Sequence, residues 1–366
     1  MIVTHVAEYA SGGVATYLKN LIDEQIKNKN ISKIYLFCSS TKSDFNLLDF
    51  QSDKVSVIKY KYKRNLAGIL KLLTLALAIK RKRTDIIHLH STFAGLLRLT
   101  LALCGCRKKI IYCSHGWAFN KETSTINKYM YMFVEKMLSF LCNKIINISD
   151  NEALSARFIK EKKMITIKNS IPDVKQMKST KSSGDFYRNL VFIGRLDKQK
   201  GIDLLIKAVD KINKKHNNIL KLTVIGDSVI DDEIIEKSDI NGVEFLGWQS
   251  AANVQKMLVQ SKALIIPSRW EGFGLTALEA MRASKMVLAS DAGALPEIIL
   301  NKTTGLIFRK DSIESLEEVL ESFILLSQNE IEEYGKKGRE RYITYFNYSN
   351  FVDEINNLYG EVVKSE

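Results

Sequence analysis

The stretch that decides the fold runs Pro267-Ser-Arg-Trp-Glu271-Gly-Phe-Gly-Leu-Thr-Ala-Leu-Glu279-Ala-Met281. It follows a short apolar run, residues 263–267, and its glycine-containing loop leads into a pattern typical of a helix from about residue 275. In open α/β sheets, ligands bind where the carboxyl end of a strand meets the N-terminus of the next helix. The stretch therefore predicts an α/β fold with a ligand site at this loop.

The residue types in this loop predict what it binds. The free N–H groups of residues 274–277 can hold a phosphate, whose charge the helix dipole favours. Glu271 and Glu279 lie on either side of the expected helix start. Each carboxylate can accept hydrogen bonds from ligand hydroxyl groups on one side of a diphosphate. The alternative is a helix with acidic residues placed only by its dipole. That alternative leaves Glu271, Gly272 and Gly274 unexplained.

A second loop carries the complementary charge. An apolar run ends at Gly194, and Arg195 and Lys200 follow before another helical pattern begins. The planar guanidinium and the lysine point charge both suit a diphosphate that gains charge; a solvated, lysine-rich turn is the alternative. Gly12 and Gly13, after the first expected strand, allow close approach of a ligand to the backbone or simply mark a turn.

Expected strands and helices alternate through the chain in two series. Short apolar runs predict strands buried on both faces, and helical periodicities predict the crossover helices between them. We expect strands at 2–6, 33–38, 55–58, 85–90, 110–113, 145–148, 190–194, 221–226, 243–245, 263–267, 286–289 and 305–308. We expect helices at 13–27, 67–82, 93–103, 126–141, 201–215, 250–261, 275–284, 294–300, 312–327, 330–343 and 349–363.

This alternation predicts two Rossmann-like α/β domains whose parallel sheets face each other across a ligand-binding cleft. The first domain spans 1–170 and the second 189–345. Polar, aperiodic residues at 171–188 form the expected linker. A C-terminal helix, 349–366, is expected to pack back on the first domain.

Composition and charge narrow the class of protein. The 366 residues are 46% hydrophobic and 26% charged, which excludes a disordered chain, and 3 Pro with 19 Gly exclude a collagen-like one. Residues 1–170 hold 28 Lys and Arg against 12 Asp and Glu, whereas residues 171–366 hold 26 against 29. The basic half predicts a polyanionic partner: anionic lipid, nucleic acid or a phosphorylated substrate. No signal peptide or membrane-spanning run is expected, which indicates a cytoplasmic protein.

Histidine and cysteine patterns favour no metal site. The five cysteines are dispersed and lack paired ligand spacing. His88 and His90 share one face of an expected strand, but no carboxylate or cysteine lies at ligand spacing from them, and we expect His88 to lie in the core. His115, at the carboxyl end of the next strand, is the better candidate for a site residue.

With these motifs in place, the sequence resembles the retaining glycosyltransferases of family four, which adopt the two-domain GT-B fold. Glu271 and Glu279 match the E-x7-E signature of that family, and Gly194-Arg195-Leu with Lys200-Gly201 matches its phosphate-binding element. Val224-Ile-Gly226-Asp and Phe245-Leu-Gly247-Trp248 match the strands that flank the nucleotide base, and residues 289–297 match the closing region. Ser284-Lys-Met286 and the serine of Asn169-Ser-Ile-Pro depart from the usual pattern.

The resemblance implies a role for each matching residue. Glu271 would contact hydroxyls of the donor sugar, Glu279 would hold the ribose, and His115 would contact the sugar from the first domain. Arg195, Lys200 and the amides of 273–275 would hold the diphosphate. The implied catalytic residues are therefore Glu271, Lys200, Arg195 and His115. The implied donor-binding residues are Gly12, Gly13, Gly194, Gly226, Gly247, Trp248, Gly272, Phe273, Gly274, Leu275 and Glu279.

The implied activity is retaining sugar transfer from a nucleotide-diphosphate sugar, with UDP as the expected nucleotide. The acceptor would be a glycan or a lipid-diphosphate-linked glycan in cell-surface polysaccharide synthesis. Because no Asp-x-Asp element follows a strand, cations and a helix N-terminus are expected to meet the diphosphate charge without a metal or other cofactor. A nucleotide-sugar epimerase on a similar fold and a non-catalytic donor-binding subunit stay as alternatives. Nucleic acid is not an expected partner, because no stacking module accompanies the charges.

The basic half also bears on location. Residues 66–79 are apolar and lie between Tyr60-Lys-Tyr-Lys-Arg64 and Lys80-Arg-Lys-Arg83. We expect the apolar stretch to be a buried crossover helix. The cationic ends suit either solvent or an anionic surface on the inner face of the plasma membrane.

Overall fold

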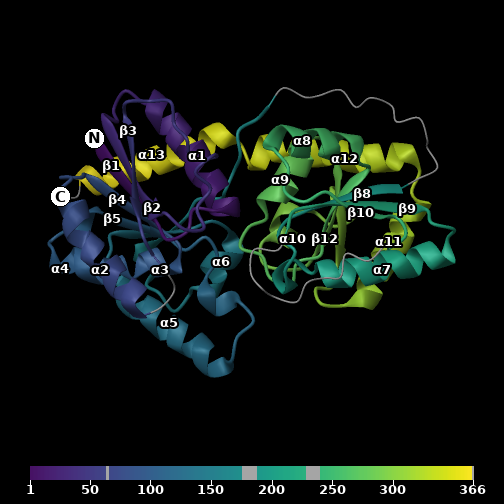
Figure 1. Cartoon of the computed structure of the whole chain (residues 1–366), viewed down its shortest axis with the longest axis horizontal. Helices are drawn as coiled ribbons and strands as arrows, with labels where there is room; N and C mark the ends of the chain where they lie inside the picture. The colour runs from purple at the N-terminus through teal and green to yellow at the C-terminus, as the bar shows by residue number, and fades with distance from the viewer. Residues whose placement is uncertain (63–65, 175–187, 228–239, 365–366) are drawn as a thin grey trace. The chain divides into compact units, whose positions relative to one another are not determined.

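The computed structural model describes residues 1–62, 66–174, 188–227 and 240–364 (Figure 1). Its contacts divide the chain into two compact units. Unit 1 consists of Met1–Pro172 and Tyr348–Glu366, and unit 2 of Asp173–Asn347. The last helix therefore belongs to the same unit as the first sheet. Most of the linker expected at 171–188 lies outside the described residues.

Unit 1 contains a seven-stranded parallel sheet in the order β3-β2-β1-β4-β5-β6-β7. Its strands are β1 (Ile2–Ala7), β2 (Lys33–Ser39), β3 (Val55–Tyr60), β4 (Ile86–His90), β5 (Ile110–Cys113), β6 (Lys144–Asn147) and β7 (Met164–Thr166). Its α-helices are α1 (Gly12–Lys27), α2 (Leu66–Lys80), α3 (Thr92–Gly95), α4 (Leu97–Leu103), α5 (Thr125–Ser139), α6 (Asp150–Ser155) and α13 (Tyr348–Lys364). The 3-10 helices are η1 (Arg107–Lys109), η2 (Ala118–Asn120) and η3 (Glu161–Lys163).

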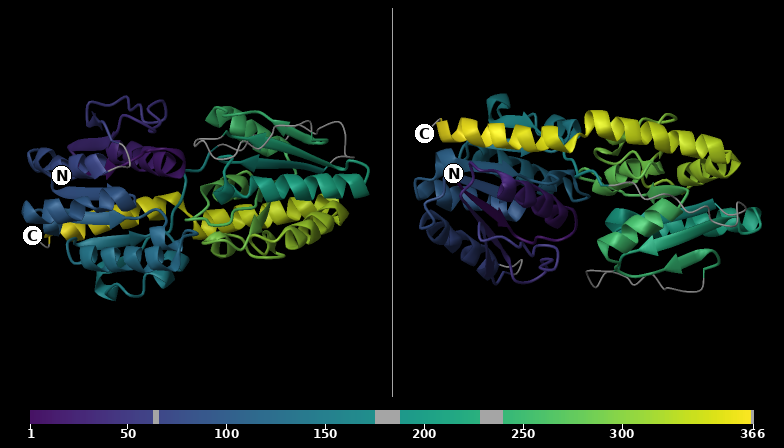
Figure 2. Two further views of the ribbon diagram at one scale, coloured as in Figure 1. Left: turned by 60° about the horizontal axis from the view of Figure 1, so that its bottom comes forward. Right: turned by 90° about the horizontal axis from the view of Figure 1, so that it is seen from above.

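Helices cover both faces of this sheet (Figures 1 and 2). On one face, His88 of β4 contacts Tyr359 of α13, and α1 packs beside α13 through Tyr17 and Phe351. On the other face, Tyr112 of β5 donates a hydrogen bond to Glu135 of α5. Burial on both faces explains why the strands read as continuous apolar runs.

Unit 2 repeats the architecture with a six-stranded parallel sheet in the order β10-β9-β8-β11-β12-β13. Its strands are β8 (Arg188–Ile193), β9 (Leu220–Ile225), β10 (Val243–Phe245), β11 (Ala263–Ile266), β12 (Met286–Ser290) and β13 (Gly305–Phe308). Its helices are η4 (Lys198–Lys200), α7 (Ile202–Lys215), α8 (Ala251–Gln260), α9 (Leu275–Arg282), α10 (Leu295–Ile298), α11 (Ile313–Leu325) and α12 (Gln328–Tyr345).

Both sheets reverse their strand order at one point, between β1 and β4 in unit 1 and between β8 and β11 in unit 2. Loops that leave neighbouring strands in opposite directions open a crevice at the carboxyl edge, where ligands of such sheets bind. The fold class expected from the sequence, two α/β units with parallel sheets, is confirmed.

Some expected elements were wrong in detail. The helix expected at 93–103 divides into α3 and α4, with Leu96 between them. The short elements α6 and β7 were not expected, since six and three residues are too few to show a period. In α2, expected to be a buried crossover helix, Ile79 is buried but Leu70 and Leu77 are exposed.

Candidate functional site

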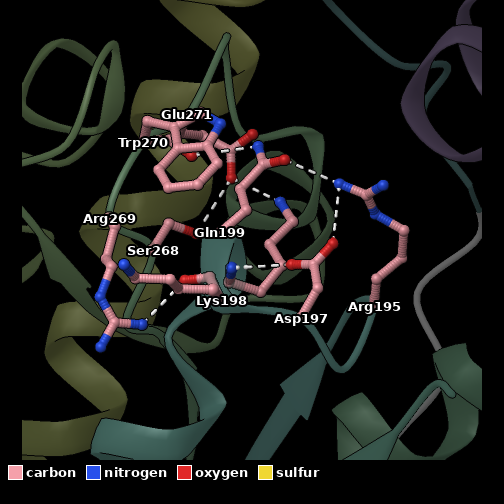
Figure 3. A network of polar contacts seen from close by, with 9 residues as sticks. Arg195, Asp197, Lys198, Gln199, Ser268, Arg269, Trp270 and Glu271 are labelled. Carbon is pink, nitrogen blue, oxygen red and sulfur yellow. Dashed lines mark hydrogen bonds and ion pairs between the residues drawn. The ribbon is translucent and has the colours of Figure 1, made fainter. Parts of the chain in front are cut away.

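The two loops singled out in the sequence both leave the switch point of unit 2. One follows β8 and contains η4; the other follows β11 and leads into α9. Because β8 pairs with β11 in parallel, their carboxyl ends lie at the same edge of the sheet. The side chains predicted to bind one ligand therefore come together there, as Figure 3 shows for this network.

An ion pair joins the two loops. Lys200 Nζ lies 2.6 Å from Glu271 Oε2, and Ser268 Oγ donates to the same carboxylate oxygen at 3.2 Å. Both charged side chains are largely shielded, with exposed fractions of 19% for Lys200 and 10% for Glu271. Two donors therefore orient the carboxylate, which keeps partial access to solvent.

Backbone packing sets the position of both residues. Asp197 caps η4 by accepting from the Lys200 N–H at 3.0 Å. Gly201 follows with φ +66°, and a Cβ there would lie 2.0 Å from the Pro267 carbonyl oxygen. Gly293, with φ +57°, packs equally close to the Glu271 carbonyl oxygen. Only glycine fits these contacts. The first holds the loop after β8 against the loop after β11, and the second holds the loop after β12 against that same loop.

Arg195 belongs to the same network. Its guanidinium donates to Gln199 Oε1 at 2.7 Å and pairs with Asp197 at 3.0 Å. Gln199 Nε2 in turn donates to the Trp270 carbonyl oxygen at 3.2 Å (Figure 3). Two groups therefore hold Arg195 beside the loop that carries Glu271.

Arg269, which the sequence analysis did not select, anchors the loop between β11 and α9. Its guanidinium is buried and donates to Asp203, Asp311 and the Lys198 carbonyl oxygen at 2.6–2.8 Å. Hydrogen bonding to Asp203, and more weakly to Asp311, raises the pKa of Arg269 despite its burial. Arg269 stands two residues before Glu271, so these bonds tie that carboxylate to η4 and α7.

The other predicted donor-binding residues of unit 2 gather at the same edge. Gly194 donates its N–H to Ile225 O, and Gly226 donates to Gly247 O, which links the ends of β8, β9 and β10. Trp248, next in the chain, is exposed. Gly272, buried Phe273 and Gly274 precede α9, whose first residue is Leu275. One expectation was wrong: the Ala277 N–H is already bonded to Gly274 O.

Glu279 lies one turn into α9 and is half-buried. Desolvation raises the pKa of its carboxyl group, and the nearby Arg282 charge opposes that effect. A carboxylate in this position would gain from hydroxyl donors that replace the lost water.

Three predicted residues lie in unit 1. Gly12 and Gly13 begin α1, and the space where a Gly12 Cβ would stand is open. His115 follows β5 with φ +53°, a left-handed conformation that is rare for a residue with a side chain and is often found at functional sites. Burial lowers the pKa of His115 to about 3, so the ring is neutral at pH 7.

A group of buried histidines lies behind His115. Ring nitrogens of His5, His88 and His90 all lie within 4.8 Å of one another, the only such group of possible metal ligands in the described part of the chain. However, His5 Nδ1 and His90 Nε2 are hydrogen-bonded at 3.0 Å, so one of them carries a hydrogen. A metal ion bound through these two nitrogens would displace that hydrogen bond.

Comparison with known families matches almost the whole chain. Residues 11–173 match the family described as "Glycosyltransferase Family 4", and residues 175–341 match "Glycosyl transferases group 1". The chain is 30% identical, over all of both chains, to an uncharacterized 41.2 kDa protein in the cps region of Klebsiella pneumoniae. It is 25% identical, over 93% of each chain, to the capsular polysaccharide biosynthesis glycosyltransferase CapM of Staphylococcus aureus.

Solved structures share the architecture. Anabaena HepE, in complex with UDP and glucose, superposes with a TM-score of 0.77 over 97% of this chain and 98% of that one, at 15% sequence identity. The two parallel-sheet units therefore form the GT-B fold. Among the described residues, no helix is long and apolar enough to cross a membrane.

Proposed function

Because this chain belongs to glycosyltransferase family 4, we propose that it transfers a sugar, with retention, from a UDP-sugar to a glycan or lipid-diphosphate-linked acceptor in capsular or related polysaccharide synthesis. The observation that carries this proposal is the Lys200–Glu271 pair at the switch point between β8 and β11. The choice of UDP is supported by the similar fold of HepE, whose structure contains UDP and glucose.

In the proposed reaction, the bond between the anomeric carbon and the diphosphate oxygen breaks as the acceptor hydroxyl attacks from the same face. Negative charge grows on the departing UDP, and Lys200, Arg195 and the N-terminus of α9 stabilise it. Glu271 accepts hydrogen bonds from hydroxyls of the sugar. The proton of the acceptor hydroxyl passes to the leaving phosphate, so no protein base is consumed.

The diphosphate charge is met by these cations and amides without a metal ion. This part of the proposal rests on two cations that already lie in one network with the loop of Glu271, at the edge where the diphosphate would bind. Transfer should therefore survive an excess of chelator. Loss of activity in chelator that manganese or magnesium restores would refute it.

To reach a lipid-linked acceptor, the enzyme must bind at a membrane surface. We propose that one face of α5 makes this contact. Ile126, Tyr129, Met130, Phe133 and Met137 recur at helical spacing on one side of α5 and are 50–81% exposed. The inner side of the helix instead carries Glu135, which is buried against Arg98 at 2.5 Å. Exposed apolar side chains on one helix face indicate an interaction surface.

Charge favours an anionic lipid surface as the occupant of this face. The exposed charged residues of 121–137 are Lys121, Lys128, Lys136 and Glu122, within the basic half of the chain. Large apolar side chains flanked by lysines are typical of helices that lie in a membrane interface. Tyr60 and Tyr62, in contrast, are buried and offer no stacking surface to nucleic acid bases.

The test of the proposed function is a product analysis with UDP-sugars and a lipid-diphosphate-linked acceptor. The proposal expects a new glycosidic bond with the anomeric configuration of the donor, which NMR of the product reveals. With Glu271→Gln, it expects at least about a hundredfold slower product formation. An epimerised nucleotide sugar formed without acceptor would assign the chain to the alternative enzyme class. Donor binding without any product would leave a non-catalytic subunit.

A further inference from the structure

Three histidines of unit 1 are joined end to end by hydrogen bonds. Gln25 Oε1 lies 2.8 Å from His5 Nε2, His5 Nδ1 lies 3.0 Å from His90 Nε2, and His90 Nδ1 lies 2.9 Å from His115 Nε2. Successive rings are nearly parallel, at 28° and 24°. This row of hydrogen-bonded rings begins at Gln25 in the buried core and ends at the half-buried ring of His115.

The sheet register brings these residues together. β1 pairs with β4 so that Ala7 lies opposite His90, and β4 pairs with β5 so that His90 lies opposite Cys113. His5 and His90 therefore share the face covered by α1, which supplies Gln25. His115, which follows β5 and has a left-handed backbone conformation, places its ring nitrogen beside His90 in the same row.

Because the histidine rings of this row are uncharged, their hydrogen bonds all run in one direction. Burial lowers the pKa of His5 to about 4 and of His115 to about 3, and it holds the pKa of His90 well below its ordinary value. A neutral imidazole has one N–H donor and one bare nitrogen acceptor. In a row of such rings, every N–H must therefore point the same way.

Gln25 sets that direction. Its carbonyl oxygen faces His5 and can only accept, so His5 carries its hydrogen on Nε2. The amide nitrogen of Gln25 makes no hydrogen bond to the described residues. Burial raises the pKa of the Tyr359 phenol, and the nearby Gln25 amide opposes that rise. The contact of its carbonyl oxygen with His5 therefore defines the orientation of the Gln25 amide in this structure.

We propose that Gln25, His5 and His90 are positioning residues that hold His115 as the Nε2–H tautomer and leave its Nδ1 as a hydrogen-bond acceptor. Following the row from Gln25, His90 Nε2 donates to His5 Nδ1, and His115 Nε2 donates to His90 Nδ1. An acceptor on His115 suits a substrate hydroxyl and rejects a second acceptor. This consequence rests on the proposed function, whereas the tautomer itself does not.

The experiment is NMR of the protein labelled with ¹⁵N at its histidine ring nitrogens, at pH 7. The proposal expects neutral, Nε2-protonated rings for His5, His90 and His115, and changed His115 ring signals in His90→Phe and His5→Phe. The matched control is His88→Phe, on the same strand face but bonded to Tyr359 outside the row; it should leave the tautomer of His115 unchanged.

Nδ1-protonated His115 in the wild type, or an equal effect of His88→Phe, would overturn the proposal. So would one equivalent of bound metal in the purified protein. Where transfer is measured, His90→Phe should lower kcat by at least about tenfold with little change in KM, the pattern for a misoriented imidazole. An unchanged kcat, with the tautomer shown by NMR, would separate a correct structural inference from a wrong function for His115.

Discussion

Lys200 Nζ and Glu271 Oε2 lie 2.6 Å apart, although their loops follow two different strands, β8 and β11. The pair holds opposite charges at the one edge of the sheet where a diphosphate and a sugar would meet. We expect Lys200→Ala and Glu271→Gln each to lower turnover by at least about a hundredfold, because each removes charge stabilisation from the transition state. Steady-state kinetics test this.

The matched control is Lys198→Ala, which removes an exposed lysine from the same short helix, η4. It should leave turnover nearly unchanged. The double variant of Lys200 and Glu271 should not show additive losses of unfolding free energy, since contacting residues couple by about 0.5–3 kcal/mol. Full activity in either single variant would contradict the assignment of the site.

Arg269 should support stability more than chemistry. Arg269→Met removes its bonds to Asp203 and Asp311 and should lower the free energy of unfolding by about 1–3 kcal/mol at pH 7. Desolvation raises the pKa of Asp203, but the hydrogen bond and charge of Arg269 outweigh it, so the net pKa is lowered. Stability from this carboxylate is present above its unfolded pKa of about 3.9 and is lost as pH falls further.

In the Arg269→Met variant the pKa of Asp203 should return upward. Below about pH 4, the free energy of unfolding of this variant should therefore fall less steeply with decreasing pH than that of the wild type. Denaturant unfolding across this range is the measurement. Identical pH slopes in the two proteins would show that the pair contributes nothing to acid sensitivity.

The buried histidines predict a second pH dependence at higher pH. His5, His88, His90 and His115 all have a lowered pKa, chiefly through burial. The unfolded chain binds their protons near pH 6.5 and the folded chain does not, so stability falls as pH drops below that value. Each ring contributes up to about 1.4 kcal/mol per pH unit. His5→Phe should reduce this slope between pH 6 and pH 5, and an unchanged slope would mean that His5 titrates normally.

The apolar face of α5 gives a prediction about membranes. Replacing Met130 and Phe133 by serine should weaken binding to anionic vesicles, because both side chains are at least half exposed on one helix face. Leu325→Ser, at a leucine of unit 2 that is even more exposed, should have no effect. Binding should also fall with added salt and with neutral lipid.

Neutralising Lys80, Arg81, Lys82 and Arg83 provides a direct comparison. Lys82 already lies over the Tyr35 ring, 4.8 Å from its centroid, so this cluster is only partly available to lipid. We expect a smaller loss of vesicle binding than from the α5 double variant. If the basic cluster alone abolishes binding and α5 has no effect, the surface proposed here is wrong.

Much of the fold could be predicted because helical periodicity and short apolar strand runs are easy to tell apart in this sequence. Short apolar runs marked every strand except β7, and the sequence placed Glu271 and Lys200 each in a loop that follows a strand. The order of the strands, which brings β8 beside β11, did not follow from the sequence alone. It depends on packing among elements far apart in the chain.

The parts that could not be predicted depend on long-range partners. Arg269 is recognisable as an anchor only when Asp203 and Asp311 are seen around it, at 66 and 42 residues' distance. In α5, the apolar residues have the spacing of a core-facing stripe, and they point outward because Glu135 is held inside by Arg98 and Tyr112. The row through His5 and His90 likewise depends on the register of β1 with β4.

In the proposed function, the edge of the sheet at β8 and β11 binds the nucleotide diphosphate of a sugar donor. The most direct measurement is the thermal unfolding midpoint with UDP, GDP, ADP and their sugars. A ligand at about a hundred times its Kd adds about 2.7 kcal/mol of stability. We expect UDP or a UDP-sugar to raise the midpoint of the wild type and of Lys198→Ala, and we expect Lys200→Ala to lose most of the rise. No stabilisation by any of these nucleotides, or an equal rise in Lys200→Ala, would contradict it.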